Sequence, residues 1–484
     1  MAAVVAVVAV AGCSPSGPPP APPQRLADEL AAHVSVDAMF AHLTALQGIA
    51  DANDGNRADG TSGFEASADY VAKILRDKGF DVSTPEFERL DSLSPGKPTL
   101  TIGTRGYPVD QASLLLQTPV GGISGPVLRP TAPAGCAAGD YQAGAARGGI
   151  AVVDDTACSV VDKQNAAAAA GAAALVVVSS PTRNGSPPGL FETGYYDRLT
   201  IPVAVANAEV GAALRRATVP VRLLLDGRTV KVKSRNVLAQ TKTGSASNVV
   251  MVGAHLDSPS VSPGMNDNGS GVAAVLETAL QLGASPAVPN AVRFAFWGGS
   301  KDQLAGSIRY VAGLDRDELN AIALYLNFDE LASPNAGYFT LDGDQSGPAS
   351  PAIDPDEVPV GSAGVERTLA GYLNLAGERP ADMPLGVASD DSPFLHAGVP
   401  VGGTTTGAAQ IKSKTQARLW GGDAGAAFDP NYGTAQDNLG AVNRDALAVM
   451  GAGVAFAVGT YAASLDGVNG VPPPVQRHRA PMGP

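Results

Sequence analysis

In the second half of the chain, short apolar runs alternate with amphipathic stretches. Val249–Ala254, Ala291–Trp297 and Ile322–Phe328 are continuous apolar runs, typical of strands buried on both faces. Between and after them, Ser270–Leu282 and Ser307–Ala312 carry the period of a helix. This alternation predicts an α/β fold with a doubly wound, mostly parallel sheet. In such sheets, functional residues gather at the carboxyl ends of the strands.

The first half has a different texture. Residues 26–112 begin with helical periodicity and continue with strand-like runs, and we assign them to the same domain as residues 226–465. Residues 113–225 are short strands and Gly/Pro turns around the Ala-rich helix Asp162–Ala173, which indicates a smaller, β-rich unit. Residues 466–484 are rich in proline and lack any period, so we expect a disordered tail.

The N-terminus carries an export signal. Residues 1–12 are apolar and too few to cross a bilayer, and Val10-Ala11-Gly12-Cys13 resembles the bacterial lipobox. We expect residues 1–12 to be a lipoprotein signal peptide, Cys13 to be the lipidated mature N-terminus and residues 13–25 to be a Pro/Ser tether. The usual basic residues before the apolar run are missing, and a plain cleaved signal is the alternative. Either way the protein is exported, to the outer side of the cell membrane or into the medium.

The charge balance limits the partners. The formal net charge is -13, with 33 Lys and Arg against 46 Asp and Glu. Such a chain lacks a basic face for phosphate backbones or anionic headgroups, so we expect no nucleic acid partner. Contact with a membrane is expected only through the lipid on Cys13.

Two cysteines remain after Cys13. Cys136 and Cys158 form an even pair in an exported chain, which favours a disulfide. Two buried free thiols are the alternative, because the sequence does not give their separation.

Candidate metal ligands follow the predicted strands. His255 ends the first strand, Asp267 lies in a Gly-rich loop before the next helix, and Asp329 ends the third strand. One imidazole and two carboxylates that converge from strand ends suit Zn²⁺ with an open coordination position. Asp257, two residues after His255, is expected to orient the imidazole through its carboxylate.

Five segments together carry a family resemblance that runs from about residue 40 to 465. The segments are Val249–Asp257, Asn266–Gly271, Arg293–Gly298, Leu326–Asp329 and Ala427–Pro430. They resemble the secreted double-zinc aminopeptidases, and the stretch from Cys136 to Val178 resembles the protease-associated domain that is inserted in many of them. The resemblance implies an aminopeptidase fold interrupted by this insert, and release of N-terminal amino acids from peptides.

Carried over residue by residue, the resemblance implies one complete zinc site and one degenerate one. His255, Asp267 and Asp329 match the ligands of one zinc, with Asp267 as the bridge to a second. The second zinc needs a Glu and a distant His, and a preceding Glu serves as general base. In this chain those three positions hold non-equivalent residues, while the tyrosine that stabilises the reaction intermediate is kept. Lys301 and Gly433 stand at the ligand positions, Ser300 at the base position, and Tyr432 is the retained tyrosine.

These replacements change the expected function. Ser300 cannot take a proton near neutral pH, and a Lys301 ammonium repels a divalent cation. We therefore expect one zinc rather than two, with hydrolysis weak or absent. An active single-zinc aminopeptidase that uses Asp302 is one alternative, and a pseudo-peptidase that binds a peptide or protein N-terminus is another. A glutaminyl cyclase is disfavoured because those relatives keep the zinc whose ligands are replaced here.

The lysine suggests a further hypothesis. Removing Zn²⁺ and its Glu ligand takes away one net positive charge, which a lysine ammonium restores. We expect Lys301 to lie near the second zinc position and to pair with Asp267, which would otherwise lack partners. A solvent-facing Lys301 is the alternative.

Overall fold

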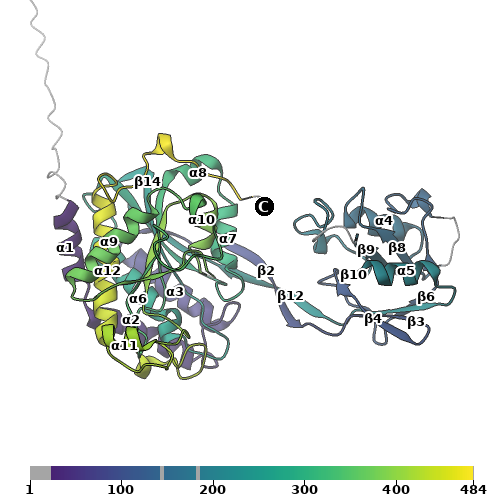
Figure 1. The fold of residues 1–484 in the computed structure, drawn as a ribbon, viewed down its shortest axis with the longest axis horizontal. Coiled ribbons are helices and arrows are strands. Elements are labelled where there is room, and N and C mark those ends of the chain that lie inside the picture. The colour runs from purple at the N-terminus through teal and green to yellow at the C-terminus, as the bar shows by residue number, and fades with distance from the viewer. Residues whose placement is uncertain (1–22, 142–146, 181–185, 388, 483–484) are drawn as a thin grey trace, which may run out of the picture. The chain divides into compact units, whose positions relative to one another are not determined.

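A computed structural model describes residues 23–141, 147–180, 186–387 and 389–482 (Figure 1). The chain divides into unit 1, Met1–Phe87 with Lys233–Pro484, and unit 2, Glu88–Val232. The chain enters unit 2 along β2 (Glu86–Ser94) and leaves it along β12 (Arg228–Arg235), and these two strands pair with each other. The predicted signal peptide and Cys13 lie outside the described residues. Helix α1 (Pro23–His33) begins inside the stretch that was expected to be tether.

Unit 1 is built on an eight-stranded sheet of order β1-β13-β15-β14-β16-β19-β17-β18. Its four central strands are parallel, and these include the three apolar runs of the sequence, which confirms the predicted fold class. They are β15 (Asn290–Trp297), β14 (Ser245–His255), β16 (Ile322–Phe328) and β19 (Val401–Thr405). The outer strands are β1 (Asp81–Ser83), β13 (Val237–Gln240), β17 (Phe339–Leu341) and β18 (Ala381–Met383).

Both faces of this sheet are covered. Along β14, Val250 and Val252 join one apolar core while Met251 joins another, as the alternation of side chains in a strand requires. The first core is formed with α2 (Val36–Asp51), α3 (Ser62–Asp77), α6 (Gly271–Leu282), α9 (Ser362–Leu375) and α12 (Arg444–Ala463). The second is formed with α7 (Ala305–Ala312), α8 (Arg316–Ala321) and α10 (Ser392–His396). Continuous apolar strands therefore result from burial on two sides.

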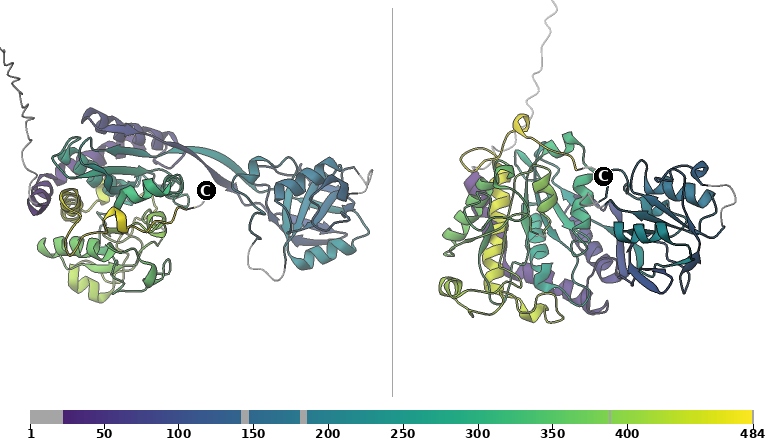
Figure 2. Two further views of the ribbon diagram at one scale, coloured as in Figure 1. Left: turned by 90° about the horizontal axis from the view of Figure 1, so that it is seen from above. Right: turned by 45° about the vertical axis from the view of Figure 1, so that its right-hand side comes forward.

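Helix α12 is a core helix. Among the described residues it alone is long and apolar enough to cross a bilayer, but 72% of its most apolar window is buried. It packs against α1, α6 and the sheet, and Figures 1 and 2 show it in yellow beside them.

Unit 2 contains two sheets. The five-stranded sheet has the order β5-β10-β9-β8-β7, and the four-stranded sheet has the order β4-β3-β11-β6. Helix α4 (Val160–Ala169) packs against β9, and Cys136 and Cys158 form a disulfide with their Cα atoms 6.1 Å apart. The strands are β3 (Thr99–Ile102), β4 (Arg105–Pro108), β5 (Asp110–Gln111), β6 (Ile123–Gly125), β7 (Val127–Leu128), β8 (Ile150–Asp154), β9 (Ala174–Val178), β10 (Val203–Ala206) and β11 (Val221–Leu224).

The bounds of unit 2 differ from the expected 113–225. Strand β3 pairs with β4 and with β11, so residues that were assigned to the first part of the larger domain belong to this unit instead. Local patterning did not show this, because β3 and β11 are more than a hundred residues apart in the sequence.

The C-terminal segment is ordered as far as it is described, contrary to the expected disorder. Arg477 donates to the carbonyl oxygen of Ser247 at 3.1 Å and to the side chain of Asn248 at 2.7 Å. Arg479 donates to the carbonyl oxygen of Ile322 at 2.9 Å. These two guanidinium groups satisfy backbone carbonyls near the starts of β16 and β14, and so fix a segment that has no period of its own.

Candidate metal centre

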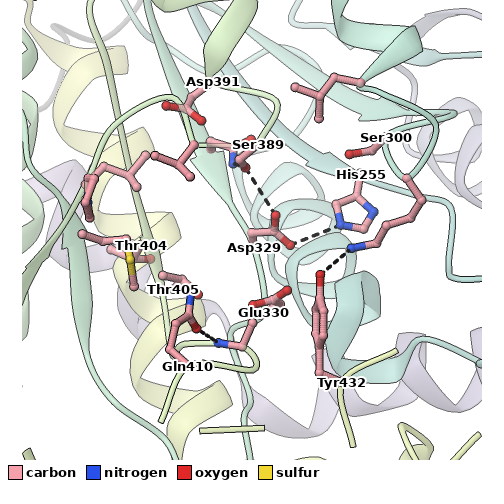
Figure 3. Close-up of a pocket in the computed structure, with 18 of the residues that line it drawn as sticks. His255, Ser300, Asp329, Glu330, Ser389, Asp391, Thr404, Thr405, Gln410 and Tyr432 are labelled. Atoms are coloured by element: carbon pink, nitrogen blue, oxygen red, sulfur yellow. Dashed lines mark hydrogen bonds and ion pairs between the residues drawn. The ribbon is translucent and has the colours of Figure 1, made fainter. Parts of the chain in front are cut away.

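Three segments bring the predicted ligands together at one edge of the sheet. His255 ends β14, Asp329 follows β16, and Asp267 lies in the short turn η3 (Met265–Ser270) that leads into α6. His255 Nε2 is 3.3 Å from Asp267 Oδ1 and 3.3 Å from Asp329 Oδ1. Figure 3 shows His255 and Asp329 facing each other across the cavity. The spacing of strand ends in the sequence therefore predicted this cluster.

The cluster suits a zinc ion. Tetrahedral Zn²⁺ with bonds of about 2.0–2.1 Å separates its ligand atoms by about 3.3 Å. Among the described residues, His255 Nε2, Asp267 Oδ2 and Asp329 Oδ1 are buried atoms without a hydrogen-bond partner. Buried polar atoms of this kind are costly unless something binds them, and a cation satisfies all three.

Asp257 acts differently from the expectation. The imidazole Nδ1 of His255 lies 2.9 Å from the main-chain oxygen of Asp257 but 3.7 Å from its carboxylate. The carbonyl therefore accepts the Nδ1 hydrogen and leaves Nε2 free for a metal. The Asp257 carboxylate accepts instead from the backbone N–H groups of Ser300, at 3.1 Å, and Lys301, at 3.0 Å. The Asp257 carboxylate thus fixes the loop that carries Ser300 and Lys301.

Lys301 reaches into the centre. Its ammonium lies 2.6 Å from Asp267 Oδ1 and 3.3 Å from the hydroxyl of Tyr432, and its side chain is 27% exposed. The expected pair is thus present, and a solvent-facing Lys301 is not observed. Burial alone would lower the pKa of Lys301, but the carboxylates of Asp267 and then Asp329 raise it above its usual range. Lys301 and a metal would share the same oxygen of Asp267.

Tyr432 lines the cavity beside Lys301, and Gly433 follows it in the chain. Burial, followed by the charge of Asp267, raises the pKa of Tyr432 to about 12, so its hydroxyl keeps its hydrogen at neutral pH. Gly433 has a φ of 69°, in the left-handed region that favours glycine. A side chain added there would meet open space.

A cavity of about 890 Å³ opens above the cluster. Its walls combine the metal-site residues with apolar and hydroxyl side chains (Figure 3). They include His255, Ser300, Lys301, Leu304, Asp329, Glu330, Leu341, Met383, Ser389, Asp391, Thr404, Thr405, Gln410 and Tyr432. Asp302 is not among the described residues that line the cavity, although Lys301 and Gln303 on either side of it are.

Two acidic groups of the cavity escaped the sequence analysis. Burial, together with the charges of Asp329 and Asp267, raises the pKa of Glu330 well above its usual range. Burial raises the pKa of Asp391 to about 7. One oxygen of Asp391 accepts from the N–H of Gly386 at 2.8 Å, and the other has no hydrogen-bond partner among the described residues. Local patterning carries no signal for Glu330 or Asp391, since neither side chain belongs to a periodic face.

Three further residues hold the loop that carries Asp267. Arg57 is fully buried and donates to the carbonyl oxygens of Pro263, at 3.0 Å, and Gly264, at 2.8 Å. The Asp437 carboxylate accepts from the N–H of Asp267 at 3.0 Å, and Asp429 accepts from the side chain of the preceding residue. These long-range contacts position Asp267 before any ligand arrives.

Two family profiles match the chain: Peptidase family M28 over residues 236–458, and the PA domain over residues 123–214. The chain is 48% identical to a Mycobacterium tuberculosis protein named probable lipoprotein aminopeptidase LpqL, over 92% of this chain and 89% of that protein. It is 36% identical to an aminopeptidase of Pseudomonas aeruginosa, over 86% of this chain and 78% of that protein.

Solved structures agree. A zinc aminopeptidase from Bacillus subtilis is 25% identical and superposes with a TM-score of 0.50, covering 88% of this chain and 94% of that chain. These similarities confirm the resemblance to zinc exopeptidases with an inserted protease-associated domain.

Proposed function

Because this chain belongs to peptidase family M28, we propose that it is an exported aminopeptidase homologue that binds at most one Zn²⁺ and hydrolyses peptides weakly or not at all. The observation that carries this proposal is the Lys301 ammonium, 2.6 Å from the Asp267 carboxylate that the resemblance assigns to both metals. An ammonium at that distance competes with a second divalent cation for the same oxygen. His255, Asp267 and Asp329 would hold the one remaining zinc.

A bound zinc would supply Lewis acidity and an activated water, as it does in other zinc hydrolases. This chain's own residues cannot complete that chemistry. A serine hydroxyl at position 300 does not accept a proton near neutral pH, and loss of a general base typically costs about 10²–10⁴-fold in rate. Tyr432 can still donate a hydrogen bond to a bound carbonyl, so it favours binding without turnover.

The single-zinc alternative with Asp302 as base has less support, because Asp302 does not line the described cavity. We therefore favour a pseudo-peptidase that holds a peptide or protein segment in the cavity above the metal cluster. Unit 2 would offer a second surface for such a partner, since it carries the match to the PA domain.

An envelope location is supported by two features. The sequence ends its apolar leader at Cys13, and the Mycobacterium tuberculosis relative is named a lipoprotein. Replacing Cys13→Ser should release the protein into the medium or leave its signal uncleaved, when membrane and soluble fractions are compared by immunoblot. Retention of a signal-cleaved form of the variant in the membrane at the wild-type level would contradict a lipid anchor.

Hydrolysis of leucine 4-nitroanilide tests the proposed function. We expect the zinc-supplemented protein to turn over this substrate at least about 100-fold more slowly than the Pseudomonas aeruginosa relative assayed in parallel. Comparable rates would overturn the proposal. If such activity were also abolished by Asp302→Ala, the single-zinc alternative would replace it.

A further inference from the structure

The Lys301 ammonium has more hydrogen-bond donors than the described part of the protein engages. A lysine ammonium has three N–H donors. Two face partners in the described part of the chain, the Asp267 carboxylate at 2.6 Å and the Tyr432 hydroxyl at 3.3 Å. The remaining donor belongs to a side chain that is 27% exposed and lines the cavity.

Tyr432 adds a second donor beside it. Because the ammonium of Lys301 donates to the Tyr432 oxygen, the tyrosine's own hydrogen is available to another acceptor. Figure 3 shows Tyr432 with its hydroxyl directed toward the part of the cavity that holds His255 and Asp329. An oxygen atom that reaches this point would accept from two neighbouring groups.

Acidic residues also line this part of the cavity, and they are the places where an amine could bind instead. Asp329 lies 3.3 Å from His255 and accepts from Ser389 at 3.4 Å. Glu330 is buried in the same wall. Asp391 has one oxygen without a hydrogen-bond partner among the described residues.

We propose that the cleft binds its ligand through a carboxylate, which accepts hydrogen bonds from the Lys301 ammonium and the Tyr432 hydroxyl. The apolar part of the ligand lies against Leu341 and Met383, which line the same cavity. The resemblance implies glutamates at positions 300 and 301, so an ammonium stands where it implies a carboxylate. The ligand is a peptide C-terminus or a free carboxylic acid, in place of the N-terminal amine that the family resemblance predicts. This inference rests on the proposed function, since an enzyme that turns over N-terminal residues would need the amine.

A pair of matched ligands tests the preference in the wild-type protein. 4-Methylpentanoate and 4-methylpentylamine share one apolar chain and differ in the charged group, and leucine carries both groups. Calorimetric titration should detect the carboxylate and leucine in both EDTA-treated and zinc-loaded protein, with the amine at least about tenfold weaker. Binding of the amine with equal or higher affinity, or no binding of the carboxylate up to millimolar concentration, would overturn the proposal.

Variants then assign the preference to Lys301. Lys301→Met should weaken carboxylate binding at least about tenfold in EDTA, while Lys301→Arg, which keeps a cation, should retain the preference over the amine. Lys73→Met, at an exposed lysine, is the matched control and should bind as the wild type does. Circular dichroism confirms folding of each variant. An unchanged affinity in Lys301→Met, or a preference that exists only with zinc, would show that Lys301 does not hold the ligand.

Different results would overturn the proposed function and the carboxylate site. Rapid hydrolysis of leucine 4-nitroanilide would overturn the proposed function whatever the ligand titrations show. An inert protein that prefers the amine would leave the proposed function standing and overturn the carboxylate site alone.

Discussion

The two sides of the cleft have diverged in different ways. On one side, His255 Nε2 lies 3.3 Å from Asp267 and 3.3 Å from Asp329, and the cluster contains buried atoms without a hydrogen-bond partner among the described residues. On the other side, the loop at Ser300 and Lys301 supplies no carboxylate and introduces an ammonium. In the proposed function, one side keeps its metal ligands, while the Lys301 ammonium stands where the family resemblance implies a second zinc.

The comparison shows that the backbone of this loop can be held in place independently of the side chains at positions 300 and 301. The carboxylate of Asp257 still accepts from the N–H groups of residues 300 and 301, at 3.1 and 3.0 Å, so the loop keeps its place whatever side chains it carries. Asp267 is fully buried, and the ammonium at 2.6 Å gives it the partner that a second metal would otherwise provide. Function and stability can therefore be separated by mutation.

The largest effect is expected from restoring the general base and the second-zinc ligands that the family resemblance implies. The triple variant Ser300→Glu, Lys301→Glu, Gly433→His should raise hydrolysis of leucine 4-nitroanilide by about 10²–10⁴-fold, because it returns a base and two ligands to a loop that is already held. Histidine tolerates the left-handed conformation at position 433 better than most residues, and its Cβ would meet open space.

The control for this triple variant is Ser300→Ala, Lys301→Ala, Gly433→Ala, which removes the lysine without supplying ligands and should stay inactive. A restored variant that folds, binds two zinc ions and still fails to hydrolyse the substrate would show that more than these three positions has been lost.

The second-largest effect is expected on stability, when the Lys301 ammonium alone is removed. In EDTA, Lys301→Met should lower the free energy of unfolding by about 2–3 kcal/mol, below the range for a fully buried pair because Lys301 is 27% exposed. The zinc affinity should rise, since the competing ammonium is gone. Thermal unfolding with and without zinc measures both, and Lys73→Met is the control. Equal stability together with equal zinc affinity would mean that the pair contributes nothing.

The smallest effect is expected at Asp257, where a substitution distinguishes the carboxylate from the main-chain carbonyl. Asp257→Asn should cost about 1–3 kcal/mol, because one backbone N–H at residues 300–301 would face an amide N–H and lose its acceptor. Zinc affinity should change less than about tenfold, since the carbonyl of residue 257, unaltered by the substitution, accepts from His255. A loss of 10–100-fold would restore the original expectation that the carboxylate orients the imidazole.

Most of the fold could be predicted from local patterns. The apolar runs at β14, β15 and β16 gave three neighbouring parallel strands, and their ends gave His255 and Asp329. Charge counting around the replaced ligands predicted the pair between Lys301 and Asp267. Each of these features is fixed by residues close in sequence or by the general geometry of a parallel sheet.

The remainder depends on contacts that leave no local trace. Arg57, Asp437 and the C-terminal Arg477 act through hydrogen bonds to backbone groups far along the chain. A lone buried charge has no period, and its partner is a peptide group that any sequence provides. The bounds of unit 2 were missed for the same reason, since the pairing of β3 with β11 is set by tertiary contacts.

The number of metal ions tests the account most directly. Elemental analysis of protein dialysed after zinc loading should be compared between the wild type and Asp267→Ala, the variant that removes the carboxylate which would bridge two metals. We predict that the wild type holds one more zinc per chain than the variant, because the Lys301 ammonium lies 2.6 Å from the carboxylate that a second zinc would need. A difference of two ions per chain would show that a dinuclear centre forms beside Lys301, and would contradict the account.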